Sequence, residues 1–450
     1  MKHSKRTKLR KARSHDPYNR RCLRNFSRWF SAFGVGRVPV AFALGIAIIP
    51  IVVLDIRLTP FIIIDRMFQS YNSFILLAVP FFLLAANLMN SGKITDKLIE
   101  LARVLTGWMP GGLGHVNVAV SMLFAGISGS STADAAGCGK ILIPAMIKEG
   151  YDSRFAVAVT ACSSVMGVII PPSILMVVWG GVMQVSVGAL FLAGAIPGLM
   201  IGLTLMSTVY VFAKVYDYPI AGKPNFAEFI DAFKGAALAI LTPVLVIGGI
   251  VGGLVTPTES AIIAAAYALF LGVFVYRTVS FSQLGGIFYE TGRFASISLF
   301  AIGTASAFGW MLSFYNVPRL IVELLTSYEF GTFGTALVIA ALFLFFGLFI
   351  DAIPTIIILG TVLLPVAGAA DIHPVVFAII GIVSLAFGLV TPPYGLCLLI
   401  SAAIAGLNVV KVLSTVVIIL IPMLFILLLI ILFPEIVLWL PSTLMPDSFR

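Results

Sequence analysis

The sequence predicts an all-α polytopic membrane protein built from two repeats, each containing a re-entrant helical hairpin and a broken helix. Composition is the first observation, since 60% of the 450 residues are hydrophobic, only 10% are charged and the mean hydropathy is +1.10. Soluble domains do not reach such values. The second observation is a pair of Pro-Pro breaks in apolar sequence, 221 positions apart, and the third is that further landmarks share this offset. The matched landmarks are Pro171-Pro172 with Pro392-Pro393, Gly126 with Gly347, and Pro144 with Pro365.

The chain begins with a basic tail, residues 1–37, which carries twelve of the 28 lysines and arginines and a single acid, Asp16. The rest of the chain is nearly neutral. A basic segment directly before the first apolar stretch predicts a cytoplasmic N-terminus by the positive-inside rule. Nucleic-acid binding is the less favoured alternative, because juxtamembrane basic segments commonly fix topology or contact anionic lipid.

Two membrane halves follow, residues 38–213 and 235–450, joined by a polar connector at residues 214–234 that contains charges, proline and glycine. Several apolar stretches approach or reach the roughly 20 residues that cross a bilayer. Examples are Val38–Leu54, Leu190–Phe212, Ala236–Val255 and Val412–Phe433, and counting all such stretches predicts roughly ten to twelve spans. Within the halves, the hairpin repeats are expected at about residues 111–200 and 332–424. Because the segments around the Pro-Pro breaks are too short to cross alone, we expect re-entrant hairpins there, as in membrane transporters.

The tip of the first hairpin carries an unusual group of polar residues. Gly126 to Asp134 contains four hydroxyl side chains and a carboxylate at a depth where apolar residues are normal. Polar groups in the bilayer are costly unless they are satisfied, so they indicate a functional site. Small residues that only allow close helix packing are the alternative. We favour a functional site, because Ser128, Ser130 and Ser131 are clustered and the partner repeat breaks at the same point.

The matching second tip, residues 347–354, contains a lone acid, Asp351, between Ile350 and Ala352. An isolated carboxylate in an apolar run is a functional-site candidate by default. Asp351 also fits the N-cap of a half-helix that carries Pro354 in its first turn. The sequence leaves both interpretations open, and they are compatible.

The Pro-Pro breaks have a defined backbone consequence. Proline has no N–H, so Pro171 and Pro172 cannot donate to the carbonyls of Gly167 and Val168, and the same holds for the second break with the carbonyls of Gly388 and Leu389. We therefore expect four carbonyl acceptors without a helical donor, at two symmetric places. Unwound carbonyls of this kind coordinate cations in transporters with discontinuous helices. Thr391 adds a hydroxyl in the second half.

Other chemistries have little support. The four cysteines are far apart, and neither they nor the four histidines show the spacing of a metal site or a disulfide framework. We expect no enzyme activity, no cofactor and no transition metal. Thr256-Pro-Thr-Glu259 predicts a capping box, with Thr256 as N-cap and Glu259 at N3, not a catalytic motif.

Together, these motifs resemble the large membrane subunit of tripartite ATP-independent periplasmic (TRAP) transporters, also called the DctM-like subunit. The resemblance runs from about Gly36 to the last apolar stretch, and its combined motifs are highly specific. The segments that carry it are Gly126-Ile-Ser-Gly-Ser-Ser-Thr-Ala-Asp-Ala-Ala136, Ile143-Pro-Ala-Met-Ile-Lys-Glu-Gly-Tyr-Asp152, Ile170-Pro-Pro-Ser173, Phe191-Leu-Ala-Gly-Ala-Ile-Pro-Gly198, Thr256-Pro-Thr-Glu259 and Gly388-Leu-Val-Thr-Pro-Pro393.

The resemblance implies a secondary transporter in the bacterial inner membrane that imports small organic anions with a sodium gradient. It implies two partners, a periplasmic substrate-binding protein and a small four-helix membrane subunit, and an elevator-type motion of the hairpin domain. By position, it implies that sodium binds at both tips and that the Pro-Pro loops face the substrate. The implied sodium residues are Gly126, Ser128, Ser130, Ser131, Gly347, Asp351, Gly388 and Thr391, and the implied substrate residues are Pro171, Pro172, Ser173, Pro392, Pro393, Tyr394 and Gly395.

One alternative is a stand-alone ion-coupled anion transporter of the wider two-hairpin superfamily, which would need no binding protein. A passive channel fits less well, because matched helix breaks suit alternating access better than a pore. Proton coupling in place of sodium is also open, with Asp134 and Asp351 as the groups that would carry the proton. The substrate itself is not specified by the sequence.

Overall fold

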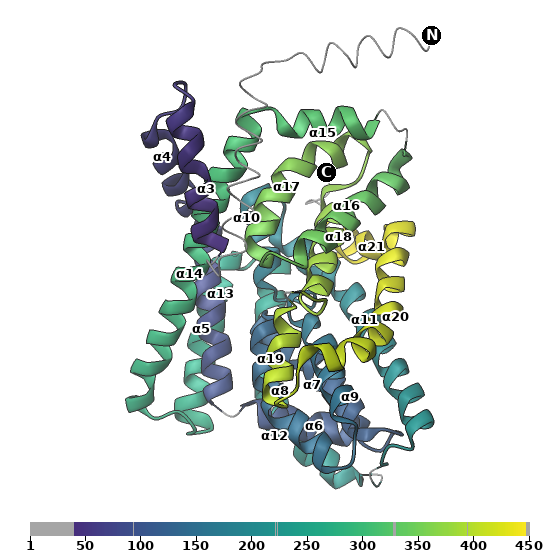
Figure 1. The fold of residues 1–450 in the computed structure, drawn as a ribbon. Helices are drawn as coiled ribbons and strands as arrows, with labels where there is room; N and C mark the ends of the chain where they lie inside the picture. The colour runs from purple at the N-terminus through teal and green to yellow at the C-terminus, as the bar shows by residue number, and fades with distance from the viewer. Residues whose placement is uncertain are drawn as a thin grey trace.

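The computed structural model describes residues 40–92, 94–220, 222, 224–326, 330–393 and 395–446. Across these ranges the chain forms helices joined by turns and short loops, and no β-strand is found in them, which confirms the predicted all-α class. Figure 1 shows two hairpin units that interleave beside a set of peripheral helices. The predicted basic tail at residues 1–37 lies outside the described residues.

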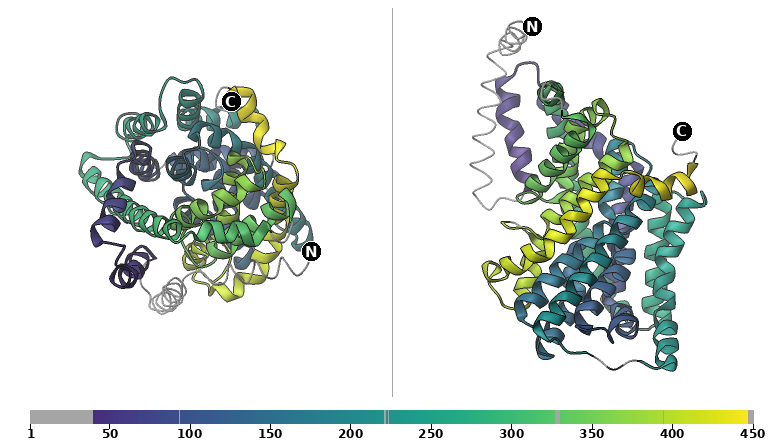
Figure 2. Two further views of the ribbon diagram at one scale, coloured as in Figure 1. Left: turned by 90° about the horizontal axis from the view of Figure 1, so that it is seen from above. Right: turned by 90° about the vertical axis from the view of Figure 1, so that its right-hand side faces the viewer.

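The peripheral helices come from two separate stretches of the chain. They are α3 (Val40–Leu54), α4 (Pro60–Tyr71), η1 (Phe74–Leu77), α5 (Ala78–Ser91), α6 (Ile94–Thr106), α12 (Phe226–Val251), α13 (Pro257–Phe270), η3 (Leu271–Val275), α14 (Phe281–Phe314) and α15 (Val317–Thr326). α5 packs along α13, and α14 packs against α3, α4 and α5. Seen from above in Figure 2, the purple N-terminal helices lie on the opposite side of the molecule from the yellow C-terminal ones.

The two hairpin units repeat one order of elements. In the first unit these are α7 (Gly112–Ser128), α8 (Ser131–Lys148), α9 (Ser153–Ser164), η2 (Val165–Val168), α10 (Ile174–Met183) and α11 (Val187–Tyr216). In the second they are α16 (Gly331–Gly347), α17 (Ala352–Ala369), α18 (Pro374–Gly388), α19 (Leu396–Ile404) and α20 (Val409–Leu432), followed by α21 (Glu435–Leu444). α7 and α8 form the first hairpin, and α16 and α17 form the second. In Figure 1 the first hairpin lies in the lower part of the molecule and the second in the upper part.

The lengths of these helices explain the hairpins. Seven helical segments are long and apolar enough to cross a membrane within the described ranges, among them α11, α12, α14 and α20. The hairpin arms α7 and α16 are apolar but only 17 residues long. The halves of the broken helices are also short: Ser153–Val168, Ile174–Met183 and Pro374–Gly388 fall in the range of 10–17 residues, and α19 has nine. This confirms the prediction that segments around the Pro-Pro breaks are too short to cross alone.

The core of the molecule lies at the broken helices. Every residue of α9 from Phe155 to Ser164 is buried, and so is every residue of α18 from Val375 to Gly388. A helix that is apolar all round needs partners on every side. α9 finds them in α7, α8, α19 and α20, and α18 finds them in α16, α17 and α11.

The second half of each broken helix crosses into the other unit. α10 belongs to the first unit by sequence but packs against α17, and α19 belongs to the second unit but packs against α8 and α9. Figure 1 shows the same exchange, with α10 among the upper helices and α19 among the lower ones. The Pro-Pro loops therefore lie where the two units meet.

Helix caps set several of the boundaries. The predicted capping box at Thr256 is confirmed: Glu259 N donates to Thr256 Oγ1 at 3.3 Å, and Thr256 N donates to Glu259 Oε2 at 2.7 Å. A second capping box, Asn225 with Glu228, begins α12. Because α11 extends to Tyr216 and α12 starts at Phe226, the non-helical part of the connector is shorter than residues 214–234.

Candidate functional site

The first tip is a tight turn between α7 and α8. α7 ends at Ser128, Gly129 adopts a left-handed conformation with φ of 61°, and Ser130 is the N-cap of α8. Ala133 N donates to Ser130 Oγ at 3.4 Å, a long capping bond. Ser128 and Ser131 are almost completely buried, each about 1% exposed. The turn therefore places hydroxyl groups and free helix ends inside the protein.

This tip is held against the first Pro-Pro loop, residues 169–173, by backbone contacts. Ile174 N, at the start of α10, donates to Gly129 O at 3.2 Å. A Cβ at position 129 would lie 2.8 Å from Pro172 O, and one at Gly167 would lie 2.9 Å from Ser130 O. Only glycine permits such close approach of two backbones. The structure thus brings the predicted tip residues and the predicted loop residues together.

The first loop is anchored by a side chain. Ser173 is fully buried and is the N-cap of α10, accepting from Met176 N at 3.4 Å. Its hydroxyl donates to Val168 O at 2.7 Å. The peptide bond between Pro171 and Pro172 is cis. Ser173 therefore shapes the loop, and its predicted contact with substrate stays a prediction.

The second tip occupies the equivalent position in the second unit, but a different set of residues forms its turn. Residues 348–351 link α16 to α17, and Asp351 occupies the N-cap position of α17 without a side-chain capping bond. Gly347 lies directly against the second broken helix, since a Cβ at Gly388 would be 2.8 Å from Gly347 Cα. Gly347 and Gly388, both predicted site residues, are therefore in backbone contact.

The second Pro-Pro loop, residues 389–395, also contains a cis peptide, between Pro392 and Pro393. Thr391 Oγ1 donates to Phe387 O at 2.7 Å, which leaves the lone pairs of its oxygen available to an ion. Pro393 is exposed, whereas Gly395 is buried and is the N-cap residue of α19. Tyr394, a predicted substrate residue, lies outside the described residues.

The expectation of four carbonyls without donors needs correction. Val168 O accepts from Ser173 Oγ, Gly388 O accepts from Thr391 N at 3.2 Å, and Leu389 O accepts from Cys397 N at 2.9 Å. The donors are Ser173 directly after the first proline pair, Thr391 directly before the second pair, and Cys397 in the first turn of α19. A carbonyl oxygen has two lone pairs, so each of the three retains one for a cation.

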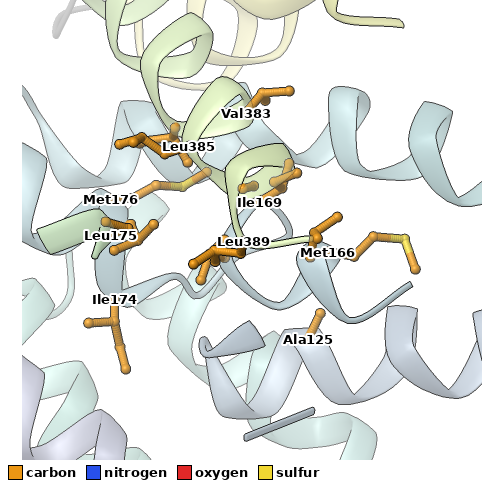
Figure 3. Close-up of a cluster of buried hydrophobic side chains, with 14 of the residues drawn as sticks. Ala125, Met166, Ile169, Ile174, Leu175, Met176, Val383, Leu385 and Leu389 are labelled. Atoms are coloured by element: carbon orange, nitrogen blue, oxygen red, sulfur yellow. The ribbon is translucent and has the colours of Figure 1, made fainter. Parts of the chain in front are cut away.

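Between the two loops lies an apolar cluster. Figure 3 shows side chains of η2 and the first loop, such as Met166 and Ile169, next to Leu385 and Leu389 at the end of the second broken helix. Leu175 of α10 also belongs to this cluster. This cluster packs the first broken helix against the second.

Each unit has one acid at or near its tip, Asp134 in the first turn of α8 and Asp351 at the N-cap of α17. Asp134 is fully buried in α8, next to the Ser121 hydroxyl and the Cys138 thiol, and neither carboxylate oxygen has a hydrogen-bond partner in the described part of the chain. Cys397, in the first turn of α19, is within electrostatic range of both Asp134 and Asp351. Within the same ranges, no group of three or more His, Cys, Asp or Glu residues could hold a metal ion. The oxygens near the tips that could bind a cation are those of hydroxyls, backbone carbonyls and single carboxylates.

Sequence reasoning missed a polar network beneath the first tip. Asn117 Nδ2 donates to Thr160 Oγ1 at 2.6 Å, Ser163 Oγ donates to Asn117 Oδ1 at 3.2 Å, and Ser121 Oγ donates to Ser163 Oγ at 3.0 Å. These buried bonds fix α7 to α9. Their sequence signal is weak, because single Ser, Thr and Asn residues in apolar helices usually bond to their own backbone. Gly129 and Gly167 were also missed as contact residues.

Two hairpins that enter from opposite ends and meet the loops of two broken helices define a membrane transport protein of two-hairpin architecture. The fold is similar to that of the YdaH transporter of Alcanivorax borkumensis, with a TM-score of 0.60 over 82% of this chain and 86% of that chain, at 14% sequence identity. The chain belongs to the tripartite ATP-independent periplasmic transporter family, as its DctM component, whose sequence pattern matches residues 28–436.

Three relatives illustrate the membership. The sialic acid TRAP transporter permease SiaT of Haemophilus influenzae is 38% identical over 85% of this chain, which spans 62% of that longer protein. The sialic acid large permease SiaM of Vibrio cholerae is 37% identical, covering 84% of this chain and 88% of the relative. The C4-dicarboxylate large permease DctM of Pseudomonas aeruginosa is 35% identical, covering 76% and 80%.

Proposed function

We propose that this chain is the large permease subunit of a TRAP transporter and that it imports small organic anions with a sodium gradient. A periplasmic substrate-binding protein would deliver the anion, and a small four-helix membrane subunit would complete the complex in the inner membrane. The observation that carries the proposal is a backbone contact between hairpin and broken helix in both units, at Gly129 with Pro172 of the first loop and at Gly347 with Gly388 at the end of α18. Two such sites in one domain suit a transporter with coupled ligands.

Sodium is the proposed ion because the groups at both tips are oxygens. The first tip offers Ser128, Ser130 and Ser131 hydroxyls beside the loop carbonyls, and the second offers Asp351 and Thr391. Hard cations prefer such ligands to sulfur or imidazole. Gly126, Gly347 and Gly388 would contribute backbone oxygens and close packing.

The anion is proposed to bind at the loops between the sites. α8, α10, α17 and α19 all begin at a tip or a loop, so four helix N-termini lie in this region. Free N–H groups and the helix dipole at such ends favour negative charge. The relatives' substrates, sialic acid and C4-dicarboxylates, are carboxylates. Pro171, Pro172, Pro392, Pro393 and Gly395 would line this position.

The test is uptake into proteoliposomes that contain this chain and its small membrane subunit, using radiolabelled sialic acid and succinate as probes. Saturable uptake of one probe only with both the binding protein and an inward sodium gradient supports the proposal. Uptake without the binding protein supports the stand-alone carrier. Uptake driven equally by a proton gradient without sodium would replace sodium by protons, with Asp134 and Asp351 as their carriers. Non-saturating flux without any gradient contradicts both the TRAP transporter and the stand-alone carrier.

Substitutions connect this assay to the site. Ser131→Ala and Thr391→Ala each remove one hydroxyl from one tip, and we expect each to raise the sodium concentration for half-maximal uptake by about tenfold, the scale of a lost hydrogen bond or ligand to a charged group. Ser296→Ala, on an exposed turn of α14 whose hydroxyl bonds only to Gly292 O in its own helix, is the matched control. An unchanged sodium dependence in both tip variants would contradict the assigned ion sites.

A further inference from the structure

A tryptophan packs α10, the second half of the first broken helix, against the second unit. Trp179 of α10 is fully buried, with its ring centroid 5.6 Å from Phe343 of α16 and 5.2 Å from Phe377 of α18. Its indole lies over Gly381 of α18, where a Cβ would be 2.6 Å from Trp179 Cη2. A rigid aromatic group above a glycine defines the position of α10 against the second unit.

A second contact shows that the exchange is reciprocal. Met183 at the end of α10 packs against Gly360 of α17, where an added Cβ would meet Met183 Cε. In the other direction, Ile404 at the end of α19 packs against Gly139 of α8, where a Cβ would lie 3.2 Å from Ile404 Cδ1. Met183 and Ile404 are 221 positions apart, and so are Gly139 and Gly360. The same pair of contacts is therefore made twice, with the units exchanged.

The other ends of these half-helices lead to the candidate ion sites. Ile174 N, in the first turn of α10, donates to Gly129 O in the first tip. Cys397 N, in the first turn of α19, donates to Leu389 O in the second loop. α10 spans ten residues, about 15 Å of rigid helix at 1.5 Å per residue. If the packing around Trp179 shifts, α10 therefore moves as a rigid unit and displaces the first tip, to which its first turn is bonded.

We propose that the two ion sites are linked crosswise, each being positioned by a half-helix that is seated in the opposite unit. Trp179 and Gly381 are positioning residues for the first tip, although Gly381 belongs to the second unit. Gly139 and Ile404 are positioning residues for the second loop, although Gly139 belongs to the first unit. The link is geometric, and it rests on the proposed function only for the identity of what the sites bind.

The first test needs no sodium. Ser131→Cys serves as a reporter at the buried first tip, and the rate of its modification by a small methanethiosulfonate is measured against the same chain without the reporter. Gly381→Ala, which displaces Trp179, is expected to raise this rate about tenfold, within the range of coupling between residues that share packing partners. Gly368→Ala on the neighbouring α17, where no atom lies within 4 Å, is the control and is expected to leave the rate unchanged.

Rescue separates positioning from general damage. Trp179→Phe removes the indole atoms nearest to position 381, so the double variant Gly381→Ala with Trp179→Phe is expected to return the rate toward that of the reporter alone. A rate that rises in Gly381→Ala without rescue, or rises equally in Gly368→Ala, would overturn the proposal. If Gly381→Ala does not fold, Trp179→Leu empties the same seat, and an unchanged rate there overturns the proposal equally.

The second test examines the contact between Gly139 and Ile404, which is less tight than that between Gly381 and Trp179. Gly139→Ala, in the first unit, is expected to raise the modification rate of a Thr391→Cys reporter in the second loop about threefold, and Ile404→Val, which lacks Cδ1, is expected to reduce that rise. An effect of Gly139→Ala on the Ser131→Cys reporter alone would show that the link runs within a unit, contrary to the proposal.

Uptake then distinguishes two failures. If sodium drives uptake in the wild type, Gly381→Ala is expected to raise the sodium concentration for half-maximal uptake about threefold or more, and Trp179→Phe to restore it. Sodium-driven uptake with unchanged reporter rates would overturn the crosswise link and leave the proposed function standing. Reporter rates that change as expected, with no sodium-driven uptake in the wild type, would keep the link and remove the proposed function.

Discussion

The two hairpin tips occupy equivalent places in the two units but differ in the residues that form them. The first turns tightly through Gly129, and two of its three serines are buried, with Ser128 and Ser131 each about 1% exposed. The second turns through Leu348, Phe349 and Ile350, and Phe349 is 50% exposed. Ser130 and Asp351, 221 positions apart, are the N-caps of the two returning arms.

This difference shows what the repeat preserves and what it does not. The backbone features are kept, because the fold depends on a close approach of tip and broken helix in both units. The side chains at the tips differ: the first tip carries the neutral hydroxyls of Ser128, Ser130 and Ser131, and the second carries the carboxylate of Asp351. The predictions below test that contrast.

The largest effect is expected at the tight turn. Gly129→Ala should reduce uptake by at least about tenfold, because a Cβ is disfavoured at positive φ and would lie 2.8 Å from Pro172 O. Gly253→Ala is the matched control, since Gly253 also has a positive φ of 66° but no atom within 4 Å. Uptake and yield of folded protein are measured for both. Equal losses would mean that backbone conformation alone, not contact with the loop, decides the effect.

The corresponding contact in the second unit should be similarly intolerant. Gly388→Ala would place a Cβ 2.7 Å from Gly347 C, so we expect uptake to fall about tenfold while the protein still folds. Gly368→Ala serves as control. Normal uptake by Gly388→Ala would show that the second tip tolerates separation from its broken helix, in contrast to the first.

Replacing Asp351 by asparagine tests whether its charge, and not its N-cap position, is needed for transport. Asparagine is as good an N-cap as aspartate, so Asp351→Asn should leave thermal stability within about 0.5 kcal/mol while reducing uptake about tenfold. Ser130→Ala, at the equivalent position, should lose about 1 kcal/mol of stability because a cap is removed. Stability is followed by thermal unfolding without sodium. Full uptake by Asp351→Asn would mean that transport does not need the charge of Asp351.

The smallest effect concerns two equivalent caps outside the hairpin tips. Asp152 N-caps α9 and His373 N-caps α18, each accepting from the residue two positions on, at 2.8 Å from Arg154 N and 3.2 Å from Val375 N. The hydrogen bonds from Arg154 lower the pKa of Asp152 below its usual range, so this cap stays ionised between pH 7 and pH 5.

Burial lowers the pKa of His373, so the unfolded chain takes up the proton first and the stability from neutral His373 is lost as the pH falls below about 6.5. A protonated ring cannot accept from Val375 N. His373→Asn caps without titrating and should therefore lose up to about 1 kcal/mol less stability than the wild type between pH 7 and pH 5. The check is thermal unfolding at both pH values, and an identical loss in the two proteins would exclude a titrating cap.

Much of this architecture could be predicted because proline and glycine restrict the backbone directly. The Pro-Pro pairs located both loops, and Gly126 and Gly347 located both tips. The capping box at Thr256 could also be predicted, since it depends on neighbouring residues only. Features set by local chemistry are therefore visible in the sequence.

Features set by long-range packing were not visible. An apolar run such as Ile174–Met183 does not reveal which unit it will pack against, so the exchange of α10 and α19 was not predicted. The donors that satisfy Val168 and Leu389 come from Ser173 and Cys397, whose directions depend on the folded loops. Pro144 and Pro365 mark the repeat but remain inside continuous helices.

The reciprocal pairs Met183 with Gly360 and Ile404 with Gly139 are the pattern of an isologous contact, the kind that two identical subunits make in a two-fold symmetric dimer. Here both partners belong to one chain. Neither repeat can complete its core alone, because the surface that receives its half-helix lies in the other repeat. If the chain were cut in the connector between α11 and α12, the two fragments should be unstable separately and should assemble when produced together.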